Sequence, residues 1–446
     1  MTPLAAPRVY EIGSSMSPEW VTALLMGGLL LLLACGLEIG IAMGLTAAVG
    51  LVVAVDKPLV QMAWTAWESL NSFTLLAMPL FIFMGAVFSG SGAVNLLFAA
   101  LDKWLGWLPG GLASVVIAAN GVFGAISGSS VAAAATFSMI AYPEMEKRGY
   151  DPKLSLGSIA VGGTLSVLVP PSLILIVYGS WENVSVARLF AAAFIPGALL
   201  MLLMLLTVLI MVKLRPEIAP RSAPSSWSER WKAVADMLPW LAIVIIVMGS
   251  IFGGLMTPTE ASALGAVLAL CIAWYYNTLT YRMVVDSLMS AVKVTAMIAF
   301  IIFAARLLSF VFQDIGATAK LSGAVLGLDL GKYGTMLAIV ILYLILGMFF
   351  DSMAMMLLTL SFIMPVILKL GYDPVWWGVT FVLLAEIGLV TPPFGLNLFT
   401  IQGVLPKFSI MYIARASLPF LAVMILMVWI LIFFPDLALW LPRLLY

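Results

Sequence analysis

Five charged side chains interrupt the long apolar stretches of this 446-residue chain. They are Glu38, Glu260, Arg306, Asp351 and Glu386. A charge inside a membrane costs free energy, so such residues are functional candidates unless they neutralise one another. Glu38 and Glu260 lie among small residues, which favours structural pairing. Arg306, in IIFAARLLSF, either binds a substrate carboxylate or neutralises a nearby acid.

Two proline-interrupted stretches carry a second kind of chemistry, unpaired backbone carbonyls. GGTLSVLVPPS contains Pro170 and Pro171, and EIGLVTPPFGLN contains Pro392 and Pro393. Proline lacks an N–H and clashes with the preceding helical turn, so it leaves carbonyl oxygens without partners. Such carbonyls, together with side-chain oxygens, coordinate Na⁺ at the broken helices of transporters. We therefore predict one Na⁺ site in each half of the chain.

The residues of the predicted sites are small, hydroxyl-bearing or acidic. The first Na⁺ site is predicted from Ser127, Ser129, Ser130, Gly163 and Thr164, and the second from Gly347, Asp351, Ser352, Glu386 and Thr391. The predicted substrate-binding residues are Ser130, Pro170, Pro171, Arg306, Asp351, Glu386, Pro392 and Asn397. Close helix packing is the competing interpretation of the small residues in GAISGSSVA. A matching polar turn and proline break in the other half favour ion binding.

To form these sites, the residues must lie where helices end inside the membrane. Residues 104–143 carry no charge but are rich in Gly and Ser at their centre, and residues 333–371 are split by Asp351. Each region predicts two short helices that meet at a polar turn, a re-entrant hairpin, at about 108–145 and 333–371. The free backbone groups of such a turn are tolerated where they line a cavity or are buried in protein. A full crossing with a kink is the alternative.

A fixed offset of 222 residues relates the two halves of the chain. It separates GYDP at 149–152 from GYDP at 371–374, the two Pro-Pro pairs, Pro143 from Pro365, Glu38 from Glu260, and Ser129 from Asp351. Several matches in one register indicate a duplicated unit. The predicted domains are a first repeat at 1–212, a linker at 213–235 and a second repeat at 236–446.

Apolar runs of about 20 residues predict the membrane spans. They lie near residues 20–37, 39–55, 74–99, 188–212, 236–253, 258–276, 293–312 and 411–434, with proline-broken helices at about 154–180 and 376–402. Segments 57–73 and 277–292 are predicted as amphipathic arms at the interface. The basic linker is cytoplasmic by the positive-inside rule, and counting crossings from it puts both termini outside and inverts the second repeat. Inverted repeats with broken helices are typical of secondary transporters.

Composition excludes several other classes. The chain is 63% hydrophobic and 9% charged, with 21 basic and 21 acidic residues and no His, and its mean hydropathy is +1.16. These values predict an all-α polytopic membrane protein. The lack of His excludes His-based zinc and nucleophile chemistry, and no Walker A, GxSxG or dinucleotide motif is present. We therefore expect no enzyme, no cofactor and no transition metal, and energy from an ion gradient or another chain.

Cys35 and Cys271 lie in apolar stretches without CxxC spacing, which predicts core residues rather than a disulfide.

A membrane-embedded enzyme or a channel would need a reactive dyad or a continuous polar stripe, and neither is evident in the sequence.

Several motifs resemble a known family, the large membrane subunit (DctM type) of tripartite ATP-independent periplasmic (TRAP) transporters. They include LPGGLASVVIAANGVFGAISGSSVAAAAT, PEMEKRGYDPKLSLGSIAVGGTLSVLVPPSLILIVYG, LMTPTEASALGA and EIGLVTPPFGLNLF, and the likeness runs from about Trp20 to Phe434. The resemblance implies a Na⁺-driven importer of the ion-transporter superfamily that works by an elevator movement. It also implies a bacterial inner-membrane location, which makes the outer side periplasmic.

The resemblance also bears on substrate and partners. It implies an organic acid substrate, such as a C4-dicarboxylate or sialic acid, and sites at Ser127–Ser130, Gly162–Thr164, Pro170, Pro171, Gly347–Ser352 and Glu386–Asn397. It implies a small four-helix membrane subunit (DctQ type) and a periplasmic substrate-binding protein (DctP type). Because the chain begins directly before the first span, we expect the small subunit to be a separate chain. A stand-alone carboxylate carrier of the same superfamily, without a binding protein, is the alternative.

Overall fold

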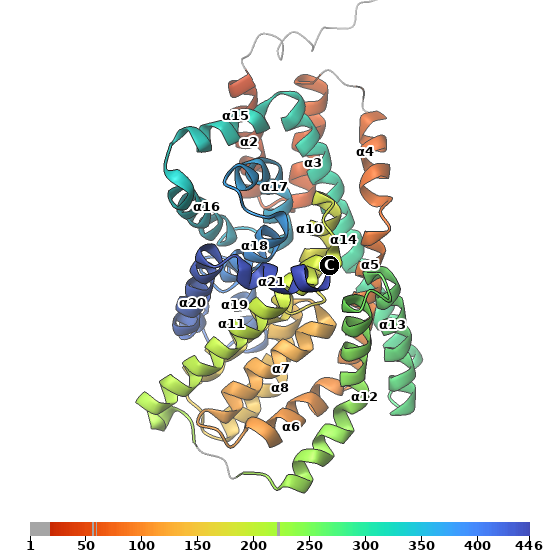
Figure 1. The fold of residues 1–446 in the computed structure, drawn as a ribbon, viewed down its shortest axis with the longest axis vertical. Coiled ribbons are helices and arrows are strands. Elements are labelled where there is room, and N and C mark those ends of the chain that lie inside the picture. The colour runs from red at the N-terminus through yellow and green to blue at the C-terminus, as the bar shows by residue number, and fades with distance from the viewer. Residues whose placement is uncertain (1–17, 56–57, 59, 221–223) are drawn as a thin grey trace, which may run out of the picture. The chain divides into compact units, whose positions relative to one another are not determined.

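The computed structural model describes residues 18–55, 58, 60–220 and 224–446, and these form helices with no β-strand among them (Figure 1). Seven helices in these ranges are long and apolar enough to cross a membrane, and five shorter apolar helices accompany them. The predicted all-α polytopic architecture is therefore confirmed, and the chain is a multi-pass membrane protein.

Two compact units make up the chain, and each draws on both halves of the sequence. The first takes the described part of 1–72 with 295–339 and 353–372, and the second takes 73–294, 340–352 and 373–446. α14 (Tyr281–Asp314) and α16 (Gly331–Gly347) continue from one unit into the other. These units follow contacts, whereas the predicted domains follow sequence repetition, so the predicted domain boundaries stay a prediction.

The first unit begins with a pair of helices. α2 (Pro18–Ala34) packs against α3 (Ile39–Val53), and α15 (Ala317–Gly327) contacts α2. Gly50 permits a close approach on α3, because a Cβ there would lie only 2.7 Å from a methyl carbon of Val311. α4 (Val60–Leu70) and most of α17 (Ser352–Lys369) belong to the same unit.

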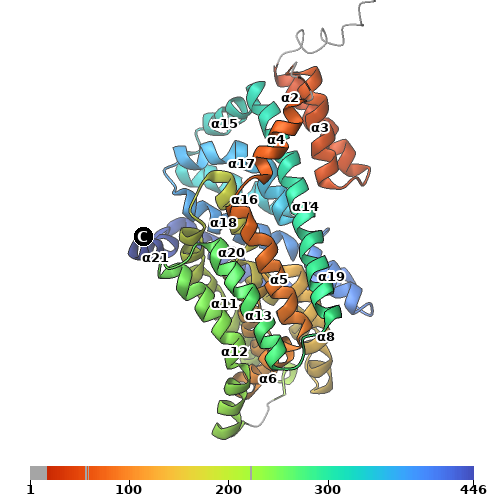
Figure 2. The same ribbon diagram turned by 90° about the vertical axis from the view of Figure 1, so that its right-hand side faces the viewer.

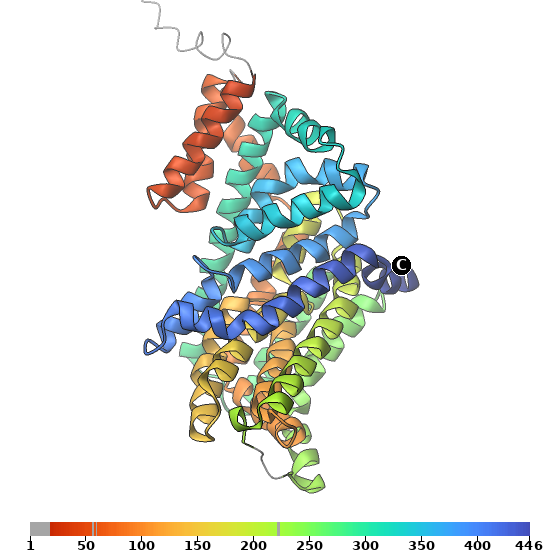
Figure 3. The ribbon, with the colours of Figure 1, turned by 90° about the vertical axis from the view of Figure 1, so that its left-hand side faces the viewer.

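The second unit is built around α9 (Pro152–Leu168), whose residues are buried from Leu154 to the end of the helix. α7 (Gly111–Ser127), α8 (Ser130–Lys147) and α20 (Ile410–Phe433) pack around it. Gly157 makes room for α20, because a Cβ there would lie 2.4 Å from the Ala416 carbonyl oxygen. In Figure 3, α20 runs beside α18 (Pro374–Leu389). Beyond Lys153, α9 carries no charged residue, so it can be buried on every side.

The other helices of the second unit surround this core. They are α5 (Ala77–Gly90), α6 (Ala93–Leu105), α10 (Leu173–Glu182), α11 (Val186–Leu214), α12 (Trp227–Phe252), α13 (Pro258–Tyr275), α19 (Leu396–Val404) and α21 (Asp436–Leu445), with short 3₁₀ turns at Thr74–Leu76 and Pro216–Ile218. Figure 2 shows α5 and α13 side by side, and the two helices pack closely.

Both predicted hairpin regions consist of two helices joined by a short turn. α7 and α8 meet at Gly128, with a φ of +60°, and Ser129, and they contact each other. A left-handed φ is open to glycine at little cost. In the second region α16 ends at Gly347 and α17 begins at Ser352, so the turn contains Asp351. Neither region is a continuous helix.

Both proline stretches interrupt helices at matching places. α9 ends at Leu168 and α10 begins at Leu173, whereas α18 ends at Leu389 and α19 begins at Leu396. The Pro170–Pro171 and Pro392–Pro393 bonds are both cis.

The two GYDP copies adopt the same local structure. Gly149 and Gly371 have φ angles of +77° and +75°. Asp151 and Asp373 each cap the following helix, accepting a hydrogen bond of 2.7 Å from a backbone N–H two residues later. An Asp at the N-cap followed by a Pro in the first turn is a strong helix-start signal.

Several helix boundaries differ from the sequence-based expectations. Segment 74–99 forms two helices, α5 and α6, because Gly92 adopts a left-handed φ of +79° between them. The predicted arm at 277–292 and the span at 293–312 largely form one helix, α14, which contains no Gly or Pro. α12 begins at Trp227, behind a Ser226–Glu229 capping box, and so starts within the segment 213–235 assigned to the linker. α15 and α21 were not predicted.

The predicted core positions of the two cysteines are wrong, although both are free thiols as expected. Cys35 and Cys271 are exposed rather than buried in the core. The outward face of a membrane helix is as apolar as its inner face, so hydropathy does not distinguish the two positions.

Candidate functional site

All but one of the predicted site residues lie in the second unit. Arg306 belongs to the first unit, on α14, so its two predicted roles stay predictions. The remaining residues come from the first hairpin turn, from the end of α16 and the start of α17, and from the breaks after α9 and α18. The structure shows which of these residues it brings together.

Glu386 is the most deeply buried acid in the second unit. It lies on α18 with 1% of its surface exposed, and neither carboxylate oxygen meets a hydrogen-bond donor among the described residues. The side chains of Ser130 and Ser352 are its polar neighbours, although neither reaches hydrogen-bond geometry. A buried carboxylate without a donor is unfavourable unless a cation or a proton compensates it.

The two serines beside Glu386 come from equivalent places. Ser130 is the first residue of α8 and Ser352 the first residue of α17, and 352 − 130 gives the repeat offset of 222. Both are buried, and the Ser352 hydroxyl has no hydrogen-bond partner in the described part of the chain. Both hairpin turns therefore present a hydroxyl to one carboxylate.

Gly163 brings three elements of the site together. A Cβ at this position of α9 would lie 2.9 Å from the Ser130 carbonyl oxygen and 3.3 Å from the Asn397 side-chain nitrogen. Asn397, on α19, donates to the Ala160 carbonyl at 3.4 Å, while its own side-chain oxygen is buried without a described partner. α8, α9 and α19 therefore converge beside an unused amide oxygen.

The two predicted threonine ligands are already hydrogen-bonded as donors. The Thr164 hydroxyl donates to the Val161 carbonyl and the Thr391 hydroxyl to the Ile387 carbonyl, each at 2.6 Å. A hydroxyl that donates keeps its oxygen lone pairs. Both side chains can therefore still coordinate a cation.

Each broken helix packs against the first limb of a hairpin without intervening side chains. A Cβ at Gly388 of α18 would lie 2.5 Å from the Gly347 backbone, and a Cβ at Gly124 of α7 would lie 2.2 Å from the Ser166 backbone. Ser166 and Gly388 are 222 residues apart. Small residues at these contacts hold the breaks against the hairpins.

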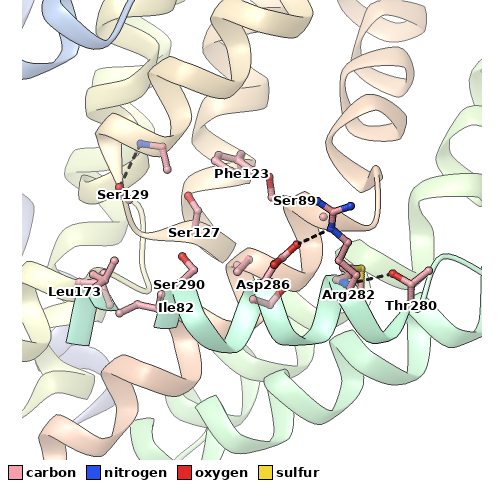
Figure 4. Close-up of a pocket in the computed structure, with 17 residues that line it drawn as sticks. Ile82, Ser89, Phe123, Ser127, Ser129, Leu173, Thr280, Arg282, Asp286 and Ser290 are labelled. Atoms are coloured by element: carbon pink, nitrogen blue, oxygen red, sulfur yellow. Dashed lines mark hydrogen bonds and ion pairs between the residues drawn. The ribbon is translucent and has the colours of Figure 1, made fainter. Parts of the chain in front are cut away.

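A cavity of about 600 Å³ lies beside the first hairpin turn. It is lined by Ser127 and Ser129 of the turn, by α5 and by the first part of α14 (Figure 4). The Ser127 hydroxyl is buried and has no described hydrogen-bond partner. The cavity therefore adjoins the site around Glu386 through the turn residues 127–130.

Charged groups form ion pairs at the C-terminal end of α8. Lys407 pairs with the exposed Glu146 and lowers the pKa of its carboxyl, mainly by donating a hydrogen bond to it. Arg148 binds Asp102 with two nitrogens, at 3.3 and 2.9 Å, and Glu144 at 2.8 Å. Contacts of two arginine nitrogens with one carboxylate fix the geometry of the pair and also make the interaction stronger.

Sequence reasoning missed three residues at or near this site. Asn120 on α7 is fully buried, with its side-chain oxygen unpaired among described residues and its nitrogen 2.6 Å from a Cβ built at Gly162. An amide within AANGVFGA was the available signal. Arg282 and Asp286 line the cavity. They escaped notice because segment 277–292 was assigned to the membrane surface.

Multiple spans, two polar hairpin turns and buried oxygens at helix breaks define a transport protein of the membrane rather than a soluble domain. Residues 26–437 match the family described as the DctM component of the tripartite ATP-independent periplasmic transporter. The chain belongs to this family, which confirms the resemblance seen in the sequence. Its relatives are transporter permeases and not enzymes.

Three relatives align over most of this chain. The C4-dicarboxylate TRAP transporter large permease protein DctM of Vibrio cholerae is 31% identical over 432 residues, covering 92% of this chain and 95% of the relative. The isethionate TRAP transporter permease protein DctMQ of Oleidesulfovibrio alaskensis is 32% identical, covering 90% and 63%. The sialic acid TRAP transporter large permease protein SiaM of Vibrio cholerae is 30% identical, covering 94% and 97%.

Among solved structures, the YdaH transporter of Alcanivorax borkumensis has a similar fold. Its TM-score is 0.61 at 14% identity, covering 95% of this chain and 98% of that chain. At this identity the likeness concerns the fold alone.

Proposed function

We propose that this chain is the large membrane subunit of a Na⁺-coupled secondary transporter that imports an organic acid. The observation that carries the proposal is Glu386, a buried carboxylate without a described donor, with a serine from each hairpin turn beside it. A monovalent cation compensates such a carboxylate and is coordinated by hydroxyl and carbonyl oxygens.

Two Na⁺ sites follow from the repeated turns. The first uses the Ser127–Ser130 turn with Gly163 and Thr164. The second uses Gly347, Asp351, Ser352 and Glu386 with Thr391. The close contact of Gly163 with the Ser130 carbonyl supports the first set. The contact of Gly388 with Gly347 supports the second.

The substrate class rests on the chemistry shared by the relatives. A C4-dicarboxylate, isethionate and sialic acid are named for the three relatives described above, and each carries a carboxylate or a sulfonate. The buried amide of Asn397 and the two Pro-Pro breaks are the proposed substrate contacts near the ions. Arg306 is a further candidate as the anion partner.

Partners and location follow from family membership. The proposed partners are a small DctQ-type subunit and a periplasmic DctP-type binding protein in a bacterial inner membrane, with both termini of this chain periplasmic. The second half is inverted relative to the first, and an elevator movement exposes the site alternately. A stand-alone carrier of the same superfamily, without a binding protein, is the alternative.

Uptake into proteoliposomes tests the proposal. The chain is reconstituted with its small subunit, and uptake of succinate and of N-acetylneuraminate is measured with and without binding protein under an inward Na⁺ gradient. We expect uptake only with Na⁺ outside and only with binding protein. Uptake that persists with K⁺ in place of Na⁺ and follows a proton gradient contradicts Na⁺ coupling. Uptake without binding protein selects the stand-alone carrier.

A further inference from the structure

The cavity beside the first hairpin turn contains a charged pair that the proposed Na⁺ sites do not use. Its walls come from α5, the α7–α8 turn, the start of α10 and the first part of α14, all within the second unit. Its volume of about 600 Å³ is within the range of about 300–1,000 Å³ that small-molecule sites occupy. The cavity is thus large enough for an organic acid.

The lining is divided between hydroxyl groups and apolar side chains. Ser89 of α5, Ser129 of the turn, and Thr280 and Ser290 beside or on α14 provide hydroxyls, while Phe123 and Leu173 provide apolar surface (Figure 4). The Ser127 hydroxyl on the same wall is buried without a described partner. Convergent hydroxyls on an apolar wall suit a small polar ligand.

Arg282 and Asp286 are the charged residues of this lining. Arg282 Nε lies 3.7 Å from Asp286 Oδ2, one helical turn apart, with side chains 93% and 70% exposed. This distance exceeds that of a hydrogen bond, and exposed pairs of this kind are weak. A ligand carboxylate that meets the guanidinium with two parallel hydrogen bonds therefore competes effectively with Asp286.

The cavity is also connected to the proposed transport site. Ser127 and Ser129, which line it, belong to the same turn as Ser130, which lies beside Glu386. In the predicted topology the loop before α14 and the base of the first hairpin are both cytoplasmic. For an importer, this is the side on which substrate is released.

We propose that this cavity is a second carboxylate site, through which the transported anion passes on release, with Arg282 as its anion partner and Asp286 as a competing counter-ion. This assignment rests on the proposed function of the chain. Asp286 keeps the affinity of Arg282 for the ligand moderate, so that the ligand leaves. Removing Asp286 should then tighten binding and slow turnover.

Cysteine protection tests the site directly. A Ser290→Cys variant, in a background of Cys35→Ala and Cys271→Ala, is reconstituted with the small subunit and labelled with a maleimide. Succinate is the probe, and succinamide is the uncharged control of the same length. We expect succinate, and not succinamide, to slow labelling at least threefold. Equal protection by both compounds, or by neither, overturns the proposal.

Charge variants then assign the anion partner. Arg282→Gln should remove the protection, Arg282→Lys should keep part of it, and Asp286→Asn should produce it at severalfold lower succinate concentration. Arg443→Gln is the matched control, because Arg443 forms an exposed pair with Asp436 at 2.7 Å in the same unit and away from the cavity lining. Full protection in Arg282→Gln overturns the role of Arg282.

The cavity site and the proposed function fail in different ways. If wild-type vesicles show no Na⁺-driven uptake of an organic acid, the proposed function fails. If they show it, and Arg282→Gln and Asp286→Asn change neither protection nor uptake rate, only the cavity assignment fails.

Discussion

The two hairpin turns share a framework and differ in charge. In the first half, Ser129 and Ser130 begin α8, and Thr164 lies 222 residues before Glu386. In the second half, Asp351 stands where Ser129 stands in the first. The first half thus offers neutral oxygens at both places, and the second offers two carboxylates. Cations are attracted to a carboxylate far more strongly than to a hydroxyl in a site of low dielectric constant.

The shared framework is a feature of the backbone. The contacts Gly124–Ser166 and Gly347–Gly388 hold each break against the first limb of a hairpin, and Asp151 and Asp373 start α9 and α18 in the same way. The two halves therefore have matching contacts around the site, while the acids are confined to one half. We expect the second half to dominate ion affinity and the first to contribute mainly through carbonyl and hydroxyl oxygens.

The largest expected effect is all-or-none and tests the inversion itself. With Cys35 and Cys271 replaced by Ala, Lys153→Cys should react with an impermeant maleimide only from the cytoplasmic side, and Lys369→Cys only from the periplasmic side. The reason is that an even number of predicted crossings separates the basic linker from the first GYDP loop, and an odd number separates it from the second. Labelling of inside-out and right-side-out vesicles measures this. If both cysteines react from one side, the repeats are parallel.

Removing the acids should have the next largest effect. Asp351→Asn and Glu386→Gln should each lower Na⁺-dependent initial uptake by about tenfold or more, since a loss of about 1.4 kcal/mol in ion binding is a factor of ten. Thr164→Val, the change at the equivalent place in the first half, should lower it only about two- to threefold. Initial uptake rates against Na⁺ concentration give all three values.

The comparison fails if Thr164→Val reduces uptake as much as Glu386→Gln does. That result would mean that the first site contributes as much to coupling as the second. Purified yield and melting temperature serve as controls, because a variant that is lost before it reaches the membrane says nothing about the ion.

The glycine contacts give effects of intermediate size on stability. Gly388→Ala and Gly124→Ala place a Cβ within 2.5 Å and 2.2 Å of backbone atoms, so each should destabilise the protein by about 1–3 kcal/mol, as overpacked cores do. Gly249→Ala is the control, since nothing lies within 4 Å of its Cβ. Thermal unfolding in detergent, followed by Trp fluorescence, measures the shifts. A shift for only one of the pair would show that the two halves do not share this contact.

The sequence predicted those parts of the molecule that depend on local chemistry. The turn at Gly128–Ser129 and the break at Pro170–Pro171 follow from Gly and Pro preferences. The two Pro-Pro pairs also predicted that the helices of the site would be interrupted. Asn397 was also identified, because an amide two residues after the glycine of a broken helix is conspicuous in an apolar stretch.

Other parts depend on packing that a single sequence does not reveal. Nothing local distinguishes the exposed Cys271 from a core residue, and nothing in segment 277–292 shows that Arg282 lines a cavity with Ser127. The continuity of α14 was missed for a related reason. A change from polar to apolar residues resembles a boundary between two helices. A helix without Gly or Pro can nevertheless continue through it unbroken.

The smallest expected change in stability comes from Ser129, and it separates two roles of this residue. Its hydroxyl caps α8, accepting from the Ala132 N–H at 3.3 Å, and it is also a predicted Na⁺ ligand. Ser129→Ala removes both functions, so it should destabilise the protein by about 1 kcal/mol and raise the Na⁺ concentration for half-maximal uptake about two- to fivefold. Ser129→Gly should raise that concentration equally while lowering stability by only a few tenths of a kcal/mol, because glycine is tolerated at the N-cap. If Ser129→Gly keeps the wild-type Na⁺ dependence, the hydroxyl serves only the helix. The neutral turn would then bind its ion through carbonyl oxygens and the remaining hydroxyls of Ser127, Ser130 and Thr164.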